Sequence, residues 1–222
     1  MLPHDPDDLS RIYAQRFQEN LEHRKSVWRV LIESFFGRFV PKDGRVLDLG
    51  CGYGEFINQV SAGKKFAMDL NPDAPKYLGP DVEFLHQDCS QPWPLPENDI
   101  DVVFTSNFFE HLPDKAALAR TLDQIRRSLK PGGCLVALGP NIKCVPGAYW
   151  DFWDHYLPLT ELSLREALQN RRFTVEICFG KFLPYTMAGK KPAALFLIRL
   201  YLALPIVWRL LGKQFLIVAR KV

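Results

Sequence analysis

Short apolar runs rich in branched residues recur along the chain, separated by polar segments that contain glycine or proline. Such runs predict strands that are buried on both faces of a sheet. We expect seven strands, at residues 45–49, 65–70, 82–87, 100–105, 134–138, 173–179 and 214–220. Residues 91–98 hold three prolines and are expected to form a loop.

Between these runs, apolar residues recur at three- and four-residue steps, which is the period of a helix. The pattern predicts helices over 55–62, 114–129 and 160–170, with Asp114 and Thr160 beginning the last two. The stretch Lys130-Pro131-Gly132-Gly133 is expected to end the helix before it. A more ragged amphipathic pattern predicts helix over 7–37, ended by Pro41 and Gly44.

Alternating strands and helices predict an α/β fold with a doubly wound, mostly parallel sheet covered on both faces. We expect residues 1–43 to form an N-terminal helical segment and 44–222 to form the main domain, with an apolar helical insertion at about 181–213. Ligands of such sheets bind at the carboxyl ends of the strands, so candidate chemistry is sought there.

Composition narrows the classes of protein. The 222 residues are 47% hydrophobic and carry a net charge of +3 with dispersed basic residues, so no nucleic-acid partner is expected. The cysteines are odd in number and have no C-x-x-C spacing, which argues against a zinc site or a disulfide framework and favours the cytoplasm. They are Cys51, Cys89, Cys134, Cys144 and Cys178. The polar N-terminus has no apolar stretch of the kind that a secretory signal needs.

Three glycines, Gly50, Gly52 and Gly54, directly follow the first predicted strand. Glycine there lets the backbone turn tightly and approach a ligand closely. The N-terminus of a following helix would offer free N–H groups to an anion. A dinucleotide fingerprint would need glycine at position 55, where Glu55 stands, so an NAD-dependent oxidoreductase is disfavoured.

Polar residues follow the next three strands in the same way. Asp69 ends the second strand and could accept hydrogen bonds from ribose hydroxyls, although this feature is shared with NAD-binding folds. Asp88 follows the third strand and could accept from an adenine amino group, and Asn107 and Phe108 follow the fourth. Each residue alone could be a cap or a turn, but four such positions in register favour a cofactor site.

Five segments, VLDLGCGYGEF, AMDLNP, HQDC, DVVFTSNFFEHL and LKPGG, stand in an order and spacing that resemble class I S-adenosylmethionine-dependent methyltransferases. The similarity covers roughly residues 44–180, and together the segments resemble the broad bacterial group often associated with polysaccharide or lipid-linked glycan genes. It implies a seven-stranded Rossmann-like sheet with an antiparallel last strand, and S-adenosylmethionine as cofactor. It also implies cofactor positions at Asp48, Gly50, Gly52, Asp69, Asp88 and Asn107, to which we add their neighbours Cys51, Tyr53, Gly54, Leu70, Cys89 and Phe108.

The predicted N-terminal helix carries Tyr13, Arg16 and Arg24. Methyltransferases of this kind often fold such a helix over the cofactor, so Arg16 is a candidate to bind the methionyl carboxylate. The alternative is a solvated, charged helix face.

Methyl transfer is an in-line displacement, and a hydroxyl nucleophile also needs a base. His155 lies in the aromatic segment YWDFWDHYLPLT, residues 149–160, with Asp151 and Asp154 near enough in sequence to orient it. We expect His155 to be the general base; the alternative is a histidine packed among aromatic rings. His111 is a second catalytic candidate, with an alternative role in orienting its loop. A metal held by Asp151, Asp154 and His155 is not expected, because the spacing fits no standard site.

Residues 193–211 contain sixteen apolar residues among nineteen, but a transmembrane span is opposed by Arg199, Arg209, Pro205 and the position between two strands of one sheet. Two interpretations stay open. The segment is a buried cap or homodimer surface. Or it lies in a membrane interface, with Lys190, Lys191, Arg199, Arg209 and Lys213 reaching head groups.

The predicted function is methyl transfer from S-adenosylmethionine to a small-molecule or glycan acceptor, with oxygen favoured as the nucleophile. One alternative is a lipid or quinone methyltransferase at a membrane surface, peripheral to its inner face. Another is a non-catalytic S-adenosylmethionine-binding partner protein.

Overall fold

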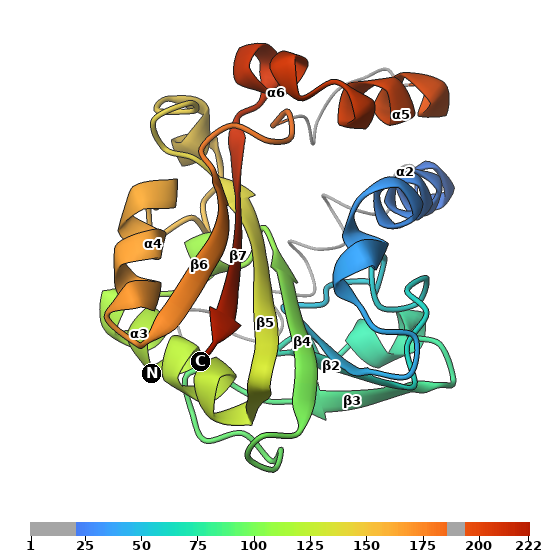
Figure 1. Cartoon of the computed structure of the whole chain (residues 1–222), viewed down its shortest axis with the longest axis vertical. Helices are drawn as coiled ribbons and strands as arrows, with labels where there is room; N and C mark the ends of the chain where they lie inside the picture. Colours follow the sequence, from blue (N-terminus) through green and yellow to red (C-terminus); the bar gives the residue numbers. More distant parts are fainter. Residues whose placement is uncertain (1–20, 186–193) are drawn as a thin grey trace.

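Seven strands form one sheet at the centre of the molecule, in the order β3-β2-β1-β4-β5-β7-β6 (Figure 1). The structure is a computed structural model and describes residues 21–185 and 194–222. The strands are β1 (Arg45–Leu49), β2 (Lys64–Asp69), β3 (Val82–His86), β4 (Ile100–Ser106), β5 (Leu129–Pro140), β6 (Phe173–Phe179) and β7 (Gln214–Lys221). The α-helices are α2 (Leu21–Ser34), α3 (Lys115–Ser128), α4 (Glu161–Gln169), α5 (Leu195–Ala203) and α6 (Pro205–Leu211). Short 3-10 helices are η1 (Phe36–Phe39), η2 (Ala74–Tyr77), η3 (Phe109–His111) and η4 (Ala148–Asp151).

The strands from β3 to β5 run parallel, and β7 runs antiparallel to both of its neighbours, β5 and β6. This confirms the predicted mostly parallel sheet with an antiparallel last strand. Because β5 and β6 both oppose β7, they point in the same direction. The chain therefore leaves β6 at the edge of the sheet where β1 to β5 also end, and α5 and α6 lie at that edge.

Strand side chains alternate between two buried layers, one on each face of the sheet. In β5, Leu135 and Ala137 join the layer that α3 and α4 cover, whereas Val136 and Leu138 join the layer that α2, α5 and α6 cover. Figure 1 shows α3 and α4 on one side of the sheet and α2 on the other. The near-continuous apolar runs in the sequence follow from this burial on both faces.

The helices on the first face begin as their sequences predict. Asp114 caps α3 by accepting a hydrogen bond from the Ala117 N–H at 2.7 Å, and Leu118, Leu122 and Ile125 form the buried side of that helix. Thr160 caps α4 through the Ser163 N–H at 3.1 Å. Both predicted helices are confirmed, within one or two residues at each end.

The predicted helix over 55–62 is wrong, because this segment forms a series of turns. Asn58 N–H still bonds to the Gly54 carbonyl and Val60 N–H to the Phe56 carbonyl. The series ends at once, because Gly63 N–H bonds back to Gly44 and leads directly into β2. The i to i−4 hydrogen bonds therefore do not continue into a regular helix, and no helix N-terminus follows the glycine loop.

Two element ends also differ from the prediction. The first helix, of which residues 7–20 lie outside the described part of the chain, ends at Ser34 rather than at residue 37. Gly37 weakens the helix there, and the Arg38 side chain donates to the Phe35 carbonyl at 2.8 Å. The fifth strand begins earlier than predicted, at Leu129 rather than at residue 134, and residues 130–133 form an irregularity within it. The helix before this stretch ends at Ser128, as expected.

Pro205 divides the apolar insertion into the two short helices α5 and α6, as predicted. Leu202 and Trp208 are buried against the core, and Arg199 pairs with Glu33 of α2 at 2.7 Å. Within 21–185 and 194–222, no helix has the length and apolarity needed to cross a membrane.

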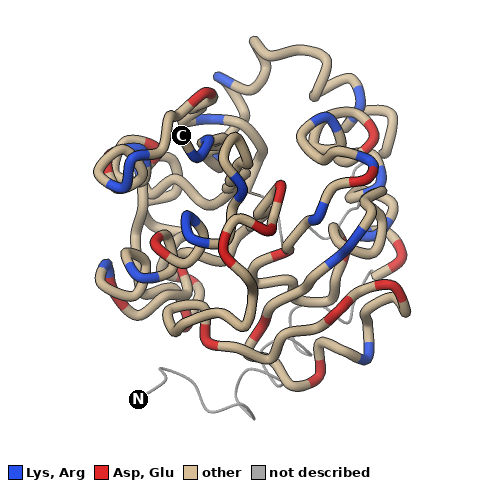
Figure 2. The backbone as a smooth tube through the Cα atoms, turned by 60° about the horizontal axis from the view of Figure 1, so that its bottom comes forward, with Lys and Arg blue, Asp and Glu red and all other residues tan. Residues whose placement is uncertain are grey.

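Charged residues occur along the whole of the described chain. In Figure 2 the lysine and arginine positions and the aspartate and glutamate positions are scattered along the tube. The net charge of +3 is modest.

We predict that Asp114→Ala lowers the free energy of unfolding by about 1 kcal/mol, because the first turn of α3 loses its cap. Urea unfolding followed by circular dichroism measures the change. Lys115→Ala, at an exposed position in the same turn, is the control and should stay within about 0.5 kcal/mol of the parent. Equal effects of the two substitutions would contradict the capping role.

Candidate cofactor and acceptor site

The glycine loop after β1 is a tight turn against β2 and β4. Gly50, Gly52 and Gly54 all have positive φ angles, of 71°, 54° and 72°. The Gly50 N–H bonds to the Met68 carbonyl at 2.9 Å, and a side chain at Gly50 would overlap the ring of Phe108. Glycine is therefore required at position 50 by both backbone conformation and packing.

Asp69, at the end of β2, holds this loop. One carboxylate oxygen accepts the Gly52 N–H at 2.9 Å, and the other accepts the Asn71 N–H at 2.9 Å. Burial raises the pKa of the Asp69 carboxyl, and the N–H groups of Asn71 and Gly52 oppose that rise. The Leu70 N–H also stabilises this carboxylate, which still has acceptor capacity for a ligand hydroxyl, because its two oxygens together offer about four lone pairs.

Two further acids lie beneath the loop. Asp48 is buried in β1, where burial and then the nearby Glu55 and Asp69 raise its pKa well above the ordinary value, and it accepts the Ile57 N–H. Glu55 is ion-paired with Arg24 of α2, at 2.5 Å between Nη2 and Oε1. The charge of Glu55 is therefore compensated, so it would repel a diphosphate little, and a dinucleotide is disfavoured by the missing glycine at position 55. The same ion pair fixes α2 to the glycine loop.

The other predicted cofactor residues also lie at the carboxyl edge of the sheet, and each makes a different contact within the protein. Cys51 is buried, and Tyr53 stacks on Tyr77 with ring centroids 4.0 Å apart. The Leu70 carbonyl lies 3.0 Å from His86 Nε2. Asp88 accepts the Ser90 N–H at 2.8 Å.

Cys89 points into the core, with its sulfur 3.3 Å from the Thr121 hydroxyl. Only the backbone of Cys89 is then left to meet a ligand at this edge. Arg16, like Tyr13, lies outside the described residues.

Asn107 is the polar residue after β4 that is best placed to meet a ligand. It adopts a positive φ of 50°, and its amide donates to the Ser106 hydroxyl at 3.1 Å. Its Oδ1 atom is buried and has no hydrogen-bond partner among residues 21–185 and 194–222. A buried acceptor without a donor is costly, so its presence at the loop of a predicted cofactor site fits S-adenosylmethionine.

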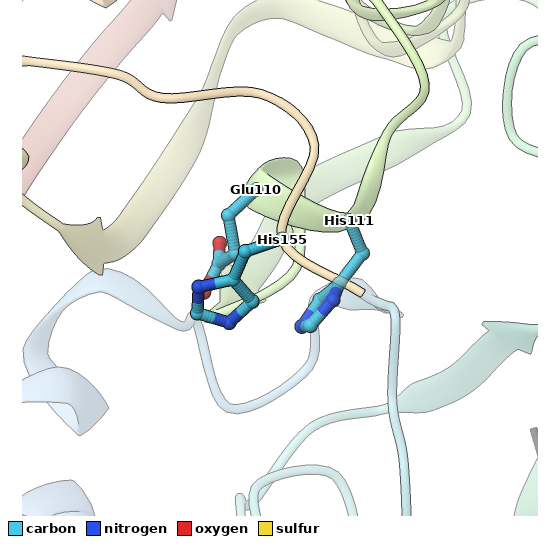
Figure 3. A group of neighbouring side chains, drawn as sticks. All are labelled: Glu110, His111 and His155. Atoms are coloured by element: carbon cyan, nitrogen blue, oxygen red, sulfur yellow. The ribbon is translucent and has the colours of Figure 1, made fainter. Parts of the chain in front are cut away.

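Beyond Asn107 and Phe108, three ionisable side chains gather. Glu110 and His111 come from η3, and His155 comes from the loop between β5 and α4; their donor atoms lie within 4.8 Å of one another. Figure 3 shows the three side chains extending to the same side of the ribbon. The loop is fixed in this place because the Glu110 carbonyl accepts the Tyr156 N–H at 2.9 Å and the Leu157 N–H at 3.0 Å.

Asp154 orients His111 rather than its neighbour His155. His111 Nδ1 lies 2.9 Å from the Asp154 carbonyl and 3.2 Å from its carboxylate. Since a carbonyl only accepts, Nδ1 carries the proton and Nε2 is left facing the cluster. Asp154 was expected to orient the neighbouring His155, and it instead contacts His111, 43 residues away in the chain.

Burial dominates the electrostatics of this cluster. It raises the pKa of Glu110 to about 7, with Asp154 adding to the rise. Burial would lower the pKa of His111, but the hydrogen bond to Asp154 and the charge of Glu110 outweigh it, so the pKa is raised. His111 in turn lowers the pKa of Asp69, so the cluster and the glycine loop share one field at the carboxyl edge.

Aromatic side chains surround His155, as the sequence suggested. Its ring stacks on Phe152 at 4.8 Å and lies 4.7 Å from Tyr149, which is fully buried. Trp150 and Trp153 instead point outward, with exposed fractions of 58% and 85%. The loop therefore has a buried imidazole inside and two exposed indoles outside.

The comparisons with known proteins agree with this architecture. A family model described as a methyltransferase domain matches residues 20–176. A Mycolicibacterium smegmatis protein described as a probable S-adenosylmethionine-dependent methyltransferase is 30% identical over 62% of this chain and 54% of its own length. A demethylmenaquinone methyltransferase of Symbiobacterium thermophilum is 24% identical over 85% of this chain and 79% of its own. The chain spans about half the length of the first curated relatives it matches.

Solved structures show the same fold. A Haloferax volcanii methyltransferase, solved with the Trm112 methyltransferase activator, has a TM-score of 0.66 at 21% identity over 94% of each chain. An Archaeoglobus fulgidus S-adenosylmethionine-dependent methyltransferase has a TM-score of 0.64 at 20% identity, over 89% of this chain and 94% of that one. The chain therefore belongs to the methyltransferase-domain family, as a class I member with S-adenosylmethionine as its cofactor.

Sequence reasoning missed Glu110. It stands inside FFEHL, which was used only to align the motif and to nominate His111. A glutamate that directly follows two phenylalanines after a buried strand was the available signal, because an acid in apolar surroundings is expected to have a raised pKa and a specific role.

We predict that Gly50→Ala weakens S-adenosylhomocysteine binding at least about tenfold, because a side chain there opposes the positive φ and displaces Phe108. Titration calorimetry measures the affinity. Gly147→Ala is the control, since a Cβ at Gly147 meets no atom within 4 Å. Unchanged affinity in Gly50→Ala would show that the cofactor does not depend on this turn.

Proposed function

We propose that this methyltransferase methylates a hydroxyl oxygen of an acceptor that is a lipid or is linked to one, at a membrane surface. The single observation that carries the lipid part is the exposed apolar face of α5 and α6. The cluster of Glu110, His111 and His155 supports oxygen as the nucleophile. A lipid-linked glycan and a lipid hydroquinone both belong to this class of acceptor.

The ionisable side chains Glu110, His111 and His155 favour methylation of oxygen. A neutral hydroxyl attacks a sulfonium methyl poorly until its proton is removed, whereas amines and thiols need less help. His155 and Glu110 are buried at this edge, and His111 is held in one orientation by Asp154. We assign His155 and His111 to activation of the acceptor hydroxyl.

The face of α5 and α6 that points away from the core is almost entirely apolar. Its exposed side chains are Leu195, Phe196, Leu197, Leu200, Leu204, Ile206, Leu210 and Leu211, with exposed fractions from 38% to 76%. Exposure on this scale marks an interaction surface. We call this set the apolar arm.

Charge favours an anionic lipid surface as the partner of the apolar arm. Residues 181–213 contain no aspartate or glutamate, and their cations are Lys181, Lys190, Lys191, Arg199, Arg209 and Lys213. Of these, Arg199 is paired with Glu33 of α2, so the attraction to anionic head groups comes from the other five. A short amphipathic element with basic and apolar residues lies in the plane of a membrane interface. A second copy of this chain would instead bring the same positive charges together.

Two relatives support a quinone or hydroquinone within this class. Their names are demethylmenaquinone methyltransferase and 2-methyl-6-phytyl-1,4-hydroquinone methyltransferase, and they are 24% and 28% identical to this chain. The predicted association with glycan genes supports a lipid-linked glycan equally. The apolar arm lies at the carboxyl edge of the sheet, where the cofactor site is expected, so its location suits a hydroquinone and a lipid-linked glycan equally.

We predict that the purified protein floats with vesicles that contain phosphatidylglycerol and that the double variant Ile206→Glu, Leu210→Glu floats at least about tenfold less. Each glutamate removes an apolar contact and adds repulsion from the anionic head groups. Leu162→Glu, an exposed leucine on α4, is the matched control and should float like the parent. If the parent stays at the bottom of the gradient and sediments as a dimer, the apolar arm is a protein interface and the membrane proposal fails.

We predict that His155→Ala lowers the rate of methyl transfer to a membrane lipid extract by about 100-fold or more while S-adenosylhomocysteine affinity changes little. Labelled S-adenosylmethionine and organic extraction give the rate, and mass spectrometry locates the methyl group. Full activity in His155→Ala would remove this residue from the reaction. A methyl group found on nitrogen or carbon would contradict oxygen methylation.

A further inference from the structure

We propose that Glu110, His111 and His155 bind a divalent transition-metal ion of the Zn²⁺ type, to which the acceptor hydroxyl coordinates. The inference rests on the proposed function for its role, but the site itself stands on the geometry of these three residues. The sequence led us to expect no metal, because only the local group Asp151, Asp154 and His155 was considered. The structure brings together a different set, joined across 45 positions of the chain.

The three groups are a suitable ligand set. Two imidazoles and one carboxylate with an open fourth position are the ligands of several catalytic zinc sites, whereas Mg²⁺ and Ca²⁺ prefer oxygen ligands. The donor atoms lie within 4.8 Å of one another in the structure without an ion. Metal–ligand bonds of about 2 Å then require only small side-chain rotations toward a common centre.

Asp154 provides the outer hydrogen bond that orients a histidine ligand in such metal sites. A histidine that binds a metal through one nitrogen usually donates its other N–H to a carboxylate or a carbonyl, which fixes the tautomer and the ring. His111 does this with both groups of Asp154, at 2.9 Å to the carbonyl and 3.2 Å to the carboxylate. Nε2 of His111 is thereby left as a ligand atom.

Burial shields the proposed site from solvent. Glu110 and His155 are only 3% and 7% exposed, so an ion there is removed from most of the solvent. One carboxylate and two neutral imidazoles leave a divalent ion with a net positive charge, which a bound oxygen can share.

Two buried oxygen atoms adjoin the site without partners of their own. Tyr149 packs on His155 with ring centroids 4.7 Å apart, and its hydroxyl forms no hydrogen bond within the part of the chain that the structure describes. Asn107, three residues before Glu110, has the similarly unpartnered Oδ1 atom. Buried polar atoms that lack partners indicate a ligand, a water or an ion, and one such atom belongs to Tyr149, which packs on His155.

The ion would activate the acceptor by lowering the pKa of its hydroxyl. The O–H bond breaks and the proton leaves to water. The oxygen lone pair then forms the new O–CH₃ bond as the S–CH₃ bond breaks, and its electron pair stays on sulfur. Each turnover thus converts S-adenosylmethionine and a hydroxyl into S-adenosylhomocysteine, a methyl ether and one released proton.

The test measures metal binding directly, on the full chain stripped with a chelator and dialysed. Titration calorimetry with ZnCl₂ should show one equivalent bound per chain, and MgCl₂ should bind much more weakly. Glu110→Gln and His155→Gln should each weaken Zn²⁺ binding at least about tenfold, as should Asp154→Asn. His86→Gln, at an exposed histidine of β3, is the matched control and should bind like the parent.

Co²⁺ gives a spectroscopic check on the ligands. Its absorption should indicate nitrogen and oxygen ligands, without the thiolate charge-transfer band that binding at a cysteine would produce. S-adenosylhomocysteine calorimetry on each variant shows that it is folded. No Zn²⁺ binding by the parent, undiminished binding in both Glu110→Gln and His155→Gln, or a thiolate band would each overturn the proposal.

The metal site and the proposed function fail in different ways. A chelated protein that methylates the hydroxyl at the full rate would overturn the metal proposal and leave the function intact. A protein that binds Zn²⁺ through these residues but methylates no hydroxyl would overturn the proposed function and leave the metal site standing.

Discussion

The hydrogen bonds of the Asp69 carboxylate are the interaction on which the site depends. They join the loop after β1, through Gly52, to the loop after β2, through Asn71. With this tie in place, Gly50 can turn beneath Phe108 of the loop after β4. The loops after three strands that are neighbours in the sheet, β2, β1 and β4, are thus fixed relative to one another before any ligand arrives. The Arg24–Glu55 ion pair adds α2 to them.

The parts of the site that the sequence predicted are those whose cause is local. A glycine that needs a positive φ, or an aspartate that ends a buried strand, shows itself within a few residues, so Gly50 and Asp69 could be found by pattern. The fold class could be predicted for the same reason, because strands that are buried on both faces of a sheet appear in the sequence as continuous apolar runs. Between the glycine loop and β2, the Gly63 N–H bonds to the Gly44 carbonyl, a contact that no local pattern shows, and the predicted helix was wrong there.

The parts that could not be predicted depend on contacts between distant segments. The Glu110 carbonyl accepts hydrogen bonds from two N–H groups of a loop more than forty residues later in the chain. The pattern of apolar and polar residues contains no sign of this contact. Asp154 was expected to serve a neighbouring imidazole and instead orients His111. The apolar insertion was ambiguous for a related reason: composition shows that it is hydrophobic, but only the direction of β6 shows at which edge of the sheet it emerges.

The Glu110 carbonyl accepts two backbone hydrogen bonds, which hold one part of the aromatic loop whatever side chains the loop carries. They anchor the end of the aromatic loop that carries His155, independently of the side chains at Trp150 and Trp153, which are exposed. Substitutions at the indoles can therefore change the outer surface of this loop without moving the imidazole. Descendants of one ancestral chain could vary that surface while keeping His155 in place.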